Sequence, residues 1–399
     1  MFLGYDVGDP IIYWILRILL LAILFFCGWG ISKDAPARYN KYAWLAGSAY
    51  SLIEGLRWLR GADYPHYYND IVTCLGKNMN GALPAVVTDE PEFLYKIWCT
   101  VFYYTSLPFW VAFVLYSALL IGGILLLLKV YRKAAIWALP LFFILTPSAE
   151  NLIRQYIAVS FILYAYYFYL VSKKKKMWLC LCAIPLIHFS GIIVVTVFVT
   201  LVYLPHKIVE QIAKKKMILC GMLLLFLYCY YFWDSSNLSY FVDFIQNNVN
   251  LDSEKGSNYV ENADRWFSEE GSISNVLGNK AVVIGFVNQI ISLVTYCSII
   301  VFGFLAQKKD NNIFISFYFS YFAIMLKTIG GDIEMFGRFY NMFIVLMPLL
   351  IGVYMYKLAS KTALKNALMI VYALNFLWYG FLREIINTSM FGYGFVWDK

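Results

Sequence analysis

The feature that most limits what this chain can fold into is a series of long apolar runs along its 399 residues. Hydrophobic residues make up 61% of the chain and charged residues only 14%, whereas soluble domains typically have about 25% charged residues. Because about 20 consecutive apolar residues suffice to cross a bilayer as a helix, the sequence predicts an all-α, polytopic transmembrane helical bundle. Cytosolic enzymes and nucleic-acid-binding proteins are excluded.

We expect about twelve spans, and Pro185 divides one long run into two short ones. The expected spans are 11–31, 42–58, 108–128, 134–147, 148–171, the two halves of 177–204, 217–233, 281–306, 313–329, 339–356 and 366–382. We predict that residues 1–399 form a single transmembrane domain. The lipid bilayer is therefore the first expected partner.

The distribution of Lys and Arg predicts which ends of the spans face the cytoplasm. With the N-terminus outside, the inner loops hold 19 Lys and Arg residues and three acids, so they sum to +16 and the rest of the chain to −8. Lysine clusters such as Lys173–Lys176 are therefore interpreted as orientation signals rather than as nucleic-acid contacts.

Two longer polar segments, 59–107 and 234–280, are predicted to lie outside the cytoplasm. Within the first, the semi-apolar stretch 93–107 is expected to be a helix in the outer interface. The second has a net charge of −5 and contains Tyr259, Trp266 and Phe267. It is either a lid that stacks on a sugar or a solvated loop.

Ionisable residues at membrane depth usually face the bundle interior and mark a site. Glu54 and Arg57 lie three positions apart and are able to pair on one helical face. Ser148 is expected to cap the fifth span, with Asn151 and Arg154 on one face of its first turns. Arg154 either snorkels to the interface or binds an anion or an internal carboxylate.

Most polar residues of the spans and short connections fall in the predicted outer half, with Arg17 as an exception. A single outward-facing polar cavity explains this distribution. Its candidate members are Arg57, Arg60, Asp63, Glu90, Glu92, Arg154, His188, Asp332, Glu334 and Arg338. Arginines beside carboxylates suit a substrate with phosphate groups, because Arg binds phosphate oxygens in a bidentate manner.

Three of these residues have a simpler interpretation that stays open. His188 follows Pro185 at the apex of the broken run, where a lone His is either a satisfied core residue or a catalytic group. Asp332 and Glu334 form a pair that either binds a cation or makes salt bridges, and two carboxylates alone are a weak metal signal. We predict no metal site.

Five short motifs in this order resemble the EpsG-like exopolysaccharide polymerases, relatives of the Wzy O-antigen and capsule polymerases. They are RGADYPHYY at 60–68, EPEFLYK at 90–96, NLIRQYIA at 151–158, HFS at 188–190 and GRFYN at 337–341. The order and the span pattern cover most of the chain. The sequence departs from the family pattern at Tyr64, where a small residue usually follows the Gly-x-Asp of the first motif.

The resemblance implies a glycosyltransferase of the bacterial inner membrane, with its active site facing the periplasm or the cell exterior. Such an enzyme joins oligosaccharide repeat units carried on undecaprenyl diphosphate, and the lipid diphosphate is the leaving group. No cofactor or metal is implied, and a chain-length regulator protein is a candidate partner. Asp63, His188 and Arg154 are the expected catalytic residues. The expected substrate-binding residues are Arg57, Arg60, Tyr64, Tyr67, Glu90, Glu92, Asn151, Gln155, Asp332, Glu334 and Arg338.

Three other functions remain as alternatives. A lipid-linked oligosaccharide flippase would need polar residues through the full depth of the bundle, whereas Asn288, Gln289 and Lys327 are too few to define an inner gate. A membrane acyltransferase would need a cytoplasmic donor site, and the inner loops are short and almost free of acids and His. A non-catalytic scaffold would leave the arginines in the spans without a function.

Overall fold

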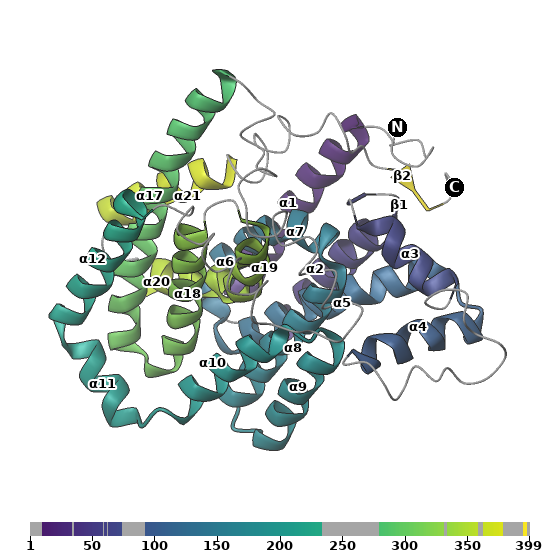
Figure 1. Cartoon of the computed structure of the whole chain (residues 1–399), viewed down its shortest axis with the longest axis horizontal. Coiled ribbons are helices and arrows are strands. Elements are labelled where there is room, and N and C mark those ends of the chain that lie inside the picture. The colour runs from purple at the N-terminus through teal and green to yellow at the C-terminus, as the bar shows by residue number, and fades with distance from the viewer. Residues whose placement is uncertain are drawn as a thin grey trace, which may run out of the picture. The chain divides into compact units, whose positions relative to one another are not determined.

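The computed structural model describes residues 10–33, 36–58, 60–61, 63–73, 92–233, 279–330, 333–357, 362–377 and 394–396, and most of these are helical (Figure 1). The predicted all-α class is confirmed. The chain divides into two compact units. Unit 1 comprises Met1–Leu204, Pro348–Lys365 and Phe376–Lys399, and unit 2 comprises Pro205–Met347 and Asn366–Asn375.

Unit 1 is built on a group of long helices that pack side by side, with short helices at their ends. The helices are α1 (Pro10–Ser32), α2 (Pro36–Gly55), α3 (Tyr64–Val72), α4 (Phe93–Thr105), α5 (Phe109–Val130), α6 (Ala135–Phe142), α7 (Thr146–Asn151), α8 (Ile153–Leu170), α9 (Lys174–Ile187) and α10 (Gly191–Tyr203). α2 packs on α1 and α5, and α8 packs on α5 and α9. Buried Leu24, Ile124 and Ile162 belong to the apolar core of this unit.

A short antiparallel strand pair lies beside the end of α2. It joins β1 (Arg57–Trp58) to β2 (Gly394–Phe395), as Figure 1 shows. The backbone N–H of Val396 also donates to the carbonyl of Leu56, at 3.1 Å. Residues from the C-terminal part of the chain therefore hold the backbone that follows α2.

Unit 2 contains α11 (His206–Lys214), α12 (Lys216–Phe232), α17 (Asn279–Lys309), α18 (Phe314–Gly330) and α19 (Glu334–Phe343). Two further helices, α20 (Met347–Lys357) and α21 (Thr362–Leu377), contain residues assigned to both units. α18 packs on α17 and α19. The core of unit 2 includes Ile300, Phe317 and Ala323, which are fully buried.

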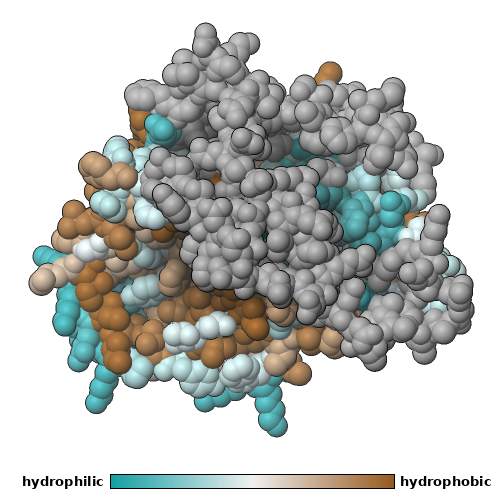
Figure 2. Space-filling model, in the orientation of Figure 1, coloured by the Kyte–Doolittle hydropathy of each residue, from teal (hydrophilic) through white to brown (hydrophobic). Residues whose placement is uncertain are grey.

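Five helical segments in the described part of the chain are long and apolar enough to cross a membrane. They are Ile11–Ser32, Phe109–Val130, Gln289–Gln307, Asn311–Gly330 and Met335–Lys357. On α1 the large apolar side chains of Ile11, Ile15 and Ile18 are more than half exposed, and Figure 2 shows broad hydrophobic areas on the visible surface. These features fit a multi-pass membrane protein. The number of twelve spans and the outward-facing cavity stay predictions.

Two helix breaks lie a few residues later than the prolines suggested. Pro185 is inside the last turn of α9, which continues to Ile187, and the break falls between His188 and Ser190. The expected boundary at Pro147 and Ser148 is wrong, because both residues are inside α7. A proline in the first turn of a helix loses no intrahelical hydrogen bond, so Pro147 starts α7 and does not end a span.

The second break lies at Leu152, with φ −96° and ψ 51°, between α7 and α8. Asn151 is the last residue of α7, and Arg154 lies in the first turn of α8. The prediction that Asn151 and Arg154 share one helical face is therefore wrong. The break places Glu150 at the end of one helix and Arg154 at the start of the next.

Candidate functional site

The carboxylate of Glu92 links three separate parts of unit 1. Its Oε1 lies 3.1 Å from Nδ1 of His188 and accepts a hydrogen bond from the backbone N–H of Phe189 at 3.2 Å. Its Oε2 lies 2.8 Å from Nη1 of Arg154. One carboxylate therefore holds the start of α8 and the turn between α9 and α10 against the start of α4.

Local backbone geometry explains why His188 is presented at this point. His188 ends α9 in an extended conformation, with φ −148° and ψ 109°, and α10 begins three residues later at Gly191. The Glu92 carboxylate thus lies at the N-terminal end of α10, where helix backbone dipoles favour a negative charge. Glu92 itself precedes the first residue of α4.

Arg154 is also held from α3 and α4. Its guanidinium lies 5.4 Å from the ring centroid of Tyr95, and the Tyr95 hydroxyl donates to Oδ2 of Asp70 at 3.0 Å. Burial raises the pKa of the Tyr95 phenol well above its usual range, so the phenol stays protonated and remains a donor. Asp70 and Tyr95 thereby fix the aromatic face against which Arg154 rests.

The cluster of Glu92, Arg154 and His188 is partly open at its edges. The side chains of Arg154 and His188 are 24% and 15% exposed, while Glu92 is 8% exposed. The Nε of Arg154 has no hydrogen-bond partner among the described residues. A buried carboxylate between two reachable cationic or proton-accepting groups is an arrangement that suits an anionic substrate and proton transfer.

A second charged cluster in unit 1 is buried. Oε1 of Glu150 lies 3.6 Å from Nη1 of Arg17, and its Oε2 accepts from Nε of Arg60 at 3.1 Å. Glu54 and Arg57 form the ion pair that their spacing predicted, at 3.8 Å. No side chain of this cluster is more than 6% exposed. Arg17, which the sequence set apart from the outer residues, is therefore a member of this buried cluster.

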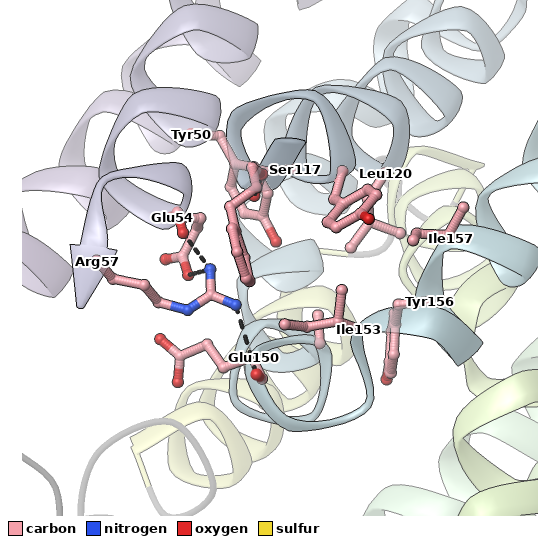
Figure 3. Close-up of a pocket in the computed structure, with 12 residues that line it drawn as sticks. Tyr50, Glu54, Arg57, Ser117, Leu120, Glu150, Ile153, Tyr156 and Ile157 are labelled. Atoms are coloured by element: carbon pink, nitrogen blue, oxygen red, sulfur yellow. Dashed lines mark hydrogen bonds and ion pairs between the residues drawn. The ribbon is translucent and has the colours of Figure 1, made fainter. Parts of the chain in front are cut away.

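Arg57 stabilises the ends of two helices. Its guanidinium donates to the backbone carbonyl of Glu54 at the end of α2 and to that of Glu150 near the end of α7, the latter at 3.4 Å. Figure 3 shows it between the two glutamates. A cation at a helix C-terminus satisfies carbonyls that have no intrahelical partner. The placement of Arg57 thus favours a structural role.

The cavity beside this buried cluster is small. It has a volume of about 20 Å³ and is lined by Tyr50, Glu54, Arg57, Tyr116 and Glu150, among others. A cavity needs about 10–15 Å³ to hold one water molecule, so this one has room for water and not for a diphosphate. The buried cluster therefore holds helices together rather than binding a large substrate as it stands.

The first-motif residues Asp63, Tyr64 and Tyr67 lie at the start of α3 and within it. Asp63 precedes α3 and is half-buried, and its side chain makes no capping hydrogen bond. Tyr64 is buried, donates to the carbonyl of Arg57 at 2.9 Å, and stacks on Phe113. Tyr67 is buried and contacts the ring of Tyr95 edge-on. Tyr64 is thus held in the core of unit 1 by one hydrogen bond and by ring stacking.

The remaining predicted residues fall in several places. Asn151 is exposed at the end of α7, and Gln155 is buried on α8. Arg338 is half-buried on α19 of unit 2. Glu90, Asp332 and the residues 234–278 of the acidic segment lie outside the described residues, as does the side chain of Glu334. Their roles stay predictions.

Sequence reasoning missed Glu150, Asp70 and Tyr95. A signal for Glu150 was present, because it is the only acid between Lys129 and Val171, and a lone acid at membrane depth needs a partner. No comparable signal marked Asp70 or Tyr95, since both lie in polar or semi-apolar segments outside the spans. Within the described ranges, no three His, Cys, Asp or Glu side chains are arranged so that they could hold a metal ion.

A comparison with protein families gives one match that bears on this arrangement. The family model of the EpsG family matches residues 11–395, which is nearly the whole chain, and the five motifs lie within this range. No curated protein and no solved structure matches the chain significantly. The resemblance inferred from the ordered motifs is confirmed. The chain belongs to the EpsG family.

Proposed function

We propose that this protein polymerises a surface polysaccharide by joining oligosaccharide repeat units carried on undecaprenyl diphosphate, at the outer leaflet of the bacterial inner membrane. Membership of the EpsG family points to a polysaccharide-polymerase-like role of the glycosyltransferase kind. The single observation that carries the finer proposal is the contact of the Glu92 carboxylate with both His188 and Arg154. In this arrangement His188 is available for proton transfer and Arg154 for stabilising negative charge.

His188 is the proposed general base. An ionised carboxylate only accepts hydrogen bonds, so Glu92 holds the proton of the imidazole on Nδ1 and leaves the lone pair on Nε2. The sugar hydroxyl of the acceptor unit gives its proton to Nε2 as its oxygen attacks the anomeric carbon of the donor unit. Glu92 then stabilises the imidazolium that forms.

Arg154 is the proposed ligand of the leaving diphosphate. As the new glycosidic bond forms, the bond between the anomeric carbon and the diphosphate oxygen breaks, and the electron pair leaves with the diphosphate. The guanidinium stabilises the charge that develops on that oxygen.

The test uses purified full-length protein and a lipid-diphosphate repeat unit, with EDTA in every reaction. His188→Ala is expected to lower kcat by about 10²–10⁴-fold, which is the usual contribution of a positioned acid or base. The control is Thr196→Ala, because Thr196 is exposed on α10 and its hydroxyl donates to the carbonyl of Ile192 in the same helix. If both variants retain wild-type kcat, His188 is not the base.

A further inference from the structure

A long apolar groove runs along the surface of unit 1 between α2 and α5, and Tyr164 of α8 completes its wall. Its volume is about 520 Å³, which is within the range of roughly 300–1,000 Å³ found for small-molecule sites. On α2 it extends from Tyr39 to Leu52, and on α5 from Val114 to Leu126. The groove does not include the cluster of Glu92, Arg154 and His188.

Small residues on both helices create the groove. Ala43, Gly47 and Ser51 recur every four positions on α2, and Ala118 and Gly122 are four apart on α5. Helical residues four apart lie on one face, so each helix turns a row of short side chains into the same space. Within the described ranges, no large side chain fills the space between these two rows.

The wall contributed by α8 also presents little polarity. The hydroxyl of Tyr164 donates to the backbone carbonyl of Leu119 at 3.1 Å, so its polar atom already has a partner. The large side chains of Trp44 and Leu52 on α2 also line the groove and are 77% and 48% exposed. An occupant would therefore meet hydrocarbon along most of the groove.

The dimensions of the groove decide between a hydrocarbon chain and another helix. The 13 steps from Tyr39 to Leu52 extend about 20 Å at 1.5 Å per residue. Even with the space at its open side counted, the empty volume is about 1,090 Å³, which gives a mean cross-section of roughly 55 Å² over that length. A helix with its side chains is about 10–12 Å across and occupies roughly 80–110 Å². The groove fits a chain better than a helix.

Basic residues gather at one end of the groove. Lys41 lies seven residues before Ser48, a groove residue, and so occupies the same side of α2. Lys129 lies four residues after Leu125, another groove residue, on the last turn of α5. Both lysines are exposed.

A third basic residue completes this end. The guanidinium of Arg132 lies 5.8 Å from the ring centroid of Tyr39, which lines the groove. By the distribution of Lys and Arg, this is the cytoplasmic end of both helices. Basic pockets between transmembrane helices on the cytoplasmic side bind anionic lipid headgroups.

We propose that the groove is a binding site for an anionic phospholipid. Lys41, Lys129 and Arg132 hold the phosphate of the headgroup, and one acyl chain lies along the row of small residues on α2 and α5. The positive charge of this end complements the lipid headgroup, and the apolar length complements the chain.

The charge part of the proposal is tested by native mass spectrometry of the full-length protein in a mild detergent. The protein is titrated with dioleoyl phosphatidylglycerol and, separately, with dioleoyl phosphatidylcholine, which has the same chains and no net charge. Wild type is expected to prefer the anionic lipid. Lys41→Gln and Lys129→Gln are each expected to weaken its binding about fivefold. They should weaken the binding of the zwitterionic lipid less, because the choline cation offsets the charge of that lipid's phosphate. Lys174→Gln, an exposed lysine at the start of α9, is the control and should change neither.

The groove part is tested with Gly47→Leu. A Cβ at Gly47 would meet only Cδ1 of Leu125, at 3.5 Å, so the larger side chain can enter the groove without displacing backbone. This variant is expected to weaken the binding of both lipids. The control is Gly221→Leu on α12, where an added Cβ meets no atom within 4 Å.

Four results would overturn the proposal. If wild type binds the two lipids with equal affinity, the basic end of the groove is not a headgroup site. If Gly47→Leu binds both lipids as wild type does, the groove does not hold an acyl chain. If Gly47→Leu instead converts a dimer to a monomer, the groove is an interface between two copies. A polyprenyl phosphate that displaces the phospholipid and is itself weakened by Gly47→Leu would assign the groove to the substrate. None of these measurements depends on polymerase activity.

Discussion

Oε1 of Glu92 and Nδ1 of His188 lie 3.1 Å apart, although 96 positions separate the two residues in the chain. The other oxygen of the same carboxylate lies 2.8 Å from Nη1 of Arg154. Three elements that are distant in sequence are thus joined through one acid. In the proposed polymerase, this contact orients the base and positions the arginine that faces the leaving group.

Replacing the carboxylate of Glu92 with an amide should test whether Glu92 orients the His188 base without itself binding the substrate. Glu92→Gln removes the charge that fixes the proton on Nδ1 and stabilises the imidazolium. We expect kcat to fall by about 10²–10⁴-fold, with a smaller change in KM for the lipid-linked unit. Steady-state kinetics of polymer formation gives both parameters. An unchanged kcat would mean that Glu92 only holds the helices together.

Polymerase activity should depend on the guanidinium of Arg154 and not merely on a positive charge at that position. Arg154→Lys keeps the charge and loses the planar pair of donors, so we expect kcat/KM to fall by about 10–10²-fold, and by about 10²–10³-fold for Arg154→Ala. Arg38→Ala is the control, because Arg38 is exposed on α2. Full activity in Arg154→Lys would contradict bidentate binding of the diphosphate.

The buried cluster should act on stability. Glu150→Gln leaves Arg17 and Arg60 without the carboxylate that compensates them, and loss of one partner from a buried pair costs about 3–5 kcal/mol. The matched control is Glu210→Gln, since Glu210 is 50% exposed and its contact with Lys214 is 3.7 Å. An exposed pair of this kind contributes at most about 0.5 kcal/mol. The temperature at which monodisperse protein is lost in detergent compares the two, and equal values would contradict a structural role for Glu150.

Two glycines should respond to alanine in opposite directions. Gly61 has φ +106°, and a Cβ there would lie 2.6 Å from the carbonyl oxygen of Glu150, so Gly61→Ala is expected to destabilise the protein by about 1–3 kcal/mol. Gly221 lies inside α12 with no atom within 4 Å of an added Cβ. Gly221→Ala should therefore stabilise by up to about 1 kcal/mol. The same heating assay measures both, and a neutral Gly61→Ala would show that the loop can move away from α7.

The positions of the long helices could be predicted from the sequence because burial in a bilayer requires continuous apolar runs. The expected stretch 108–128 became α5, and the helix expected over 93–107 became α4. The short helices α3 and α11 were not predicted, since each has only nine residues, fewer than the 11–18 residues over which an apolar period is sought. The break at Leu152 was missed because prolines mark the starts of helices as well as their ends.

The members of the site were easier to predict than its contacts. Glu92, Arg154 and His188 were each candidates, because ionisable groups near membrane-spanning segments are costly unless they have a function or a partner. That one carboxylate would contact the other two depends on how α4, α8 and α9 pack, which no local pattern encodes. Arg57 and Arg60 were expected to bind substrate, yet both are buried in contacts with Glu54 and Glu150.

The most direct measurement of the central claim is the length distribution of saccharide formed by purified wild-type protein from a lipid-diphosphate repeat unit, in detergent and with EDTA present. The account predicts a ladder of lengthened chains with release of lipid diphosphate, and loss of the ladder in His188→Ala protein that remains monodisperse. Folded wild-type protein that forms no ladder, but moves the lipid-linked unit across the bilayer of a vesicle, would contradict a polymerase and identify a transporter.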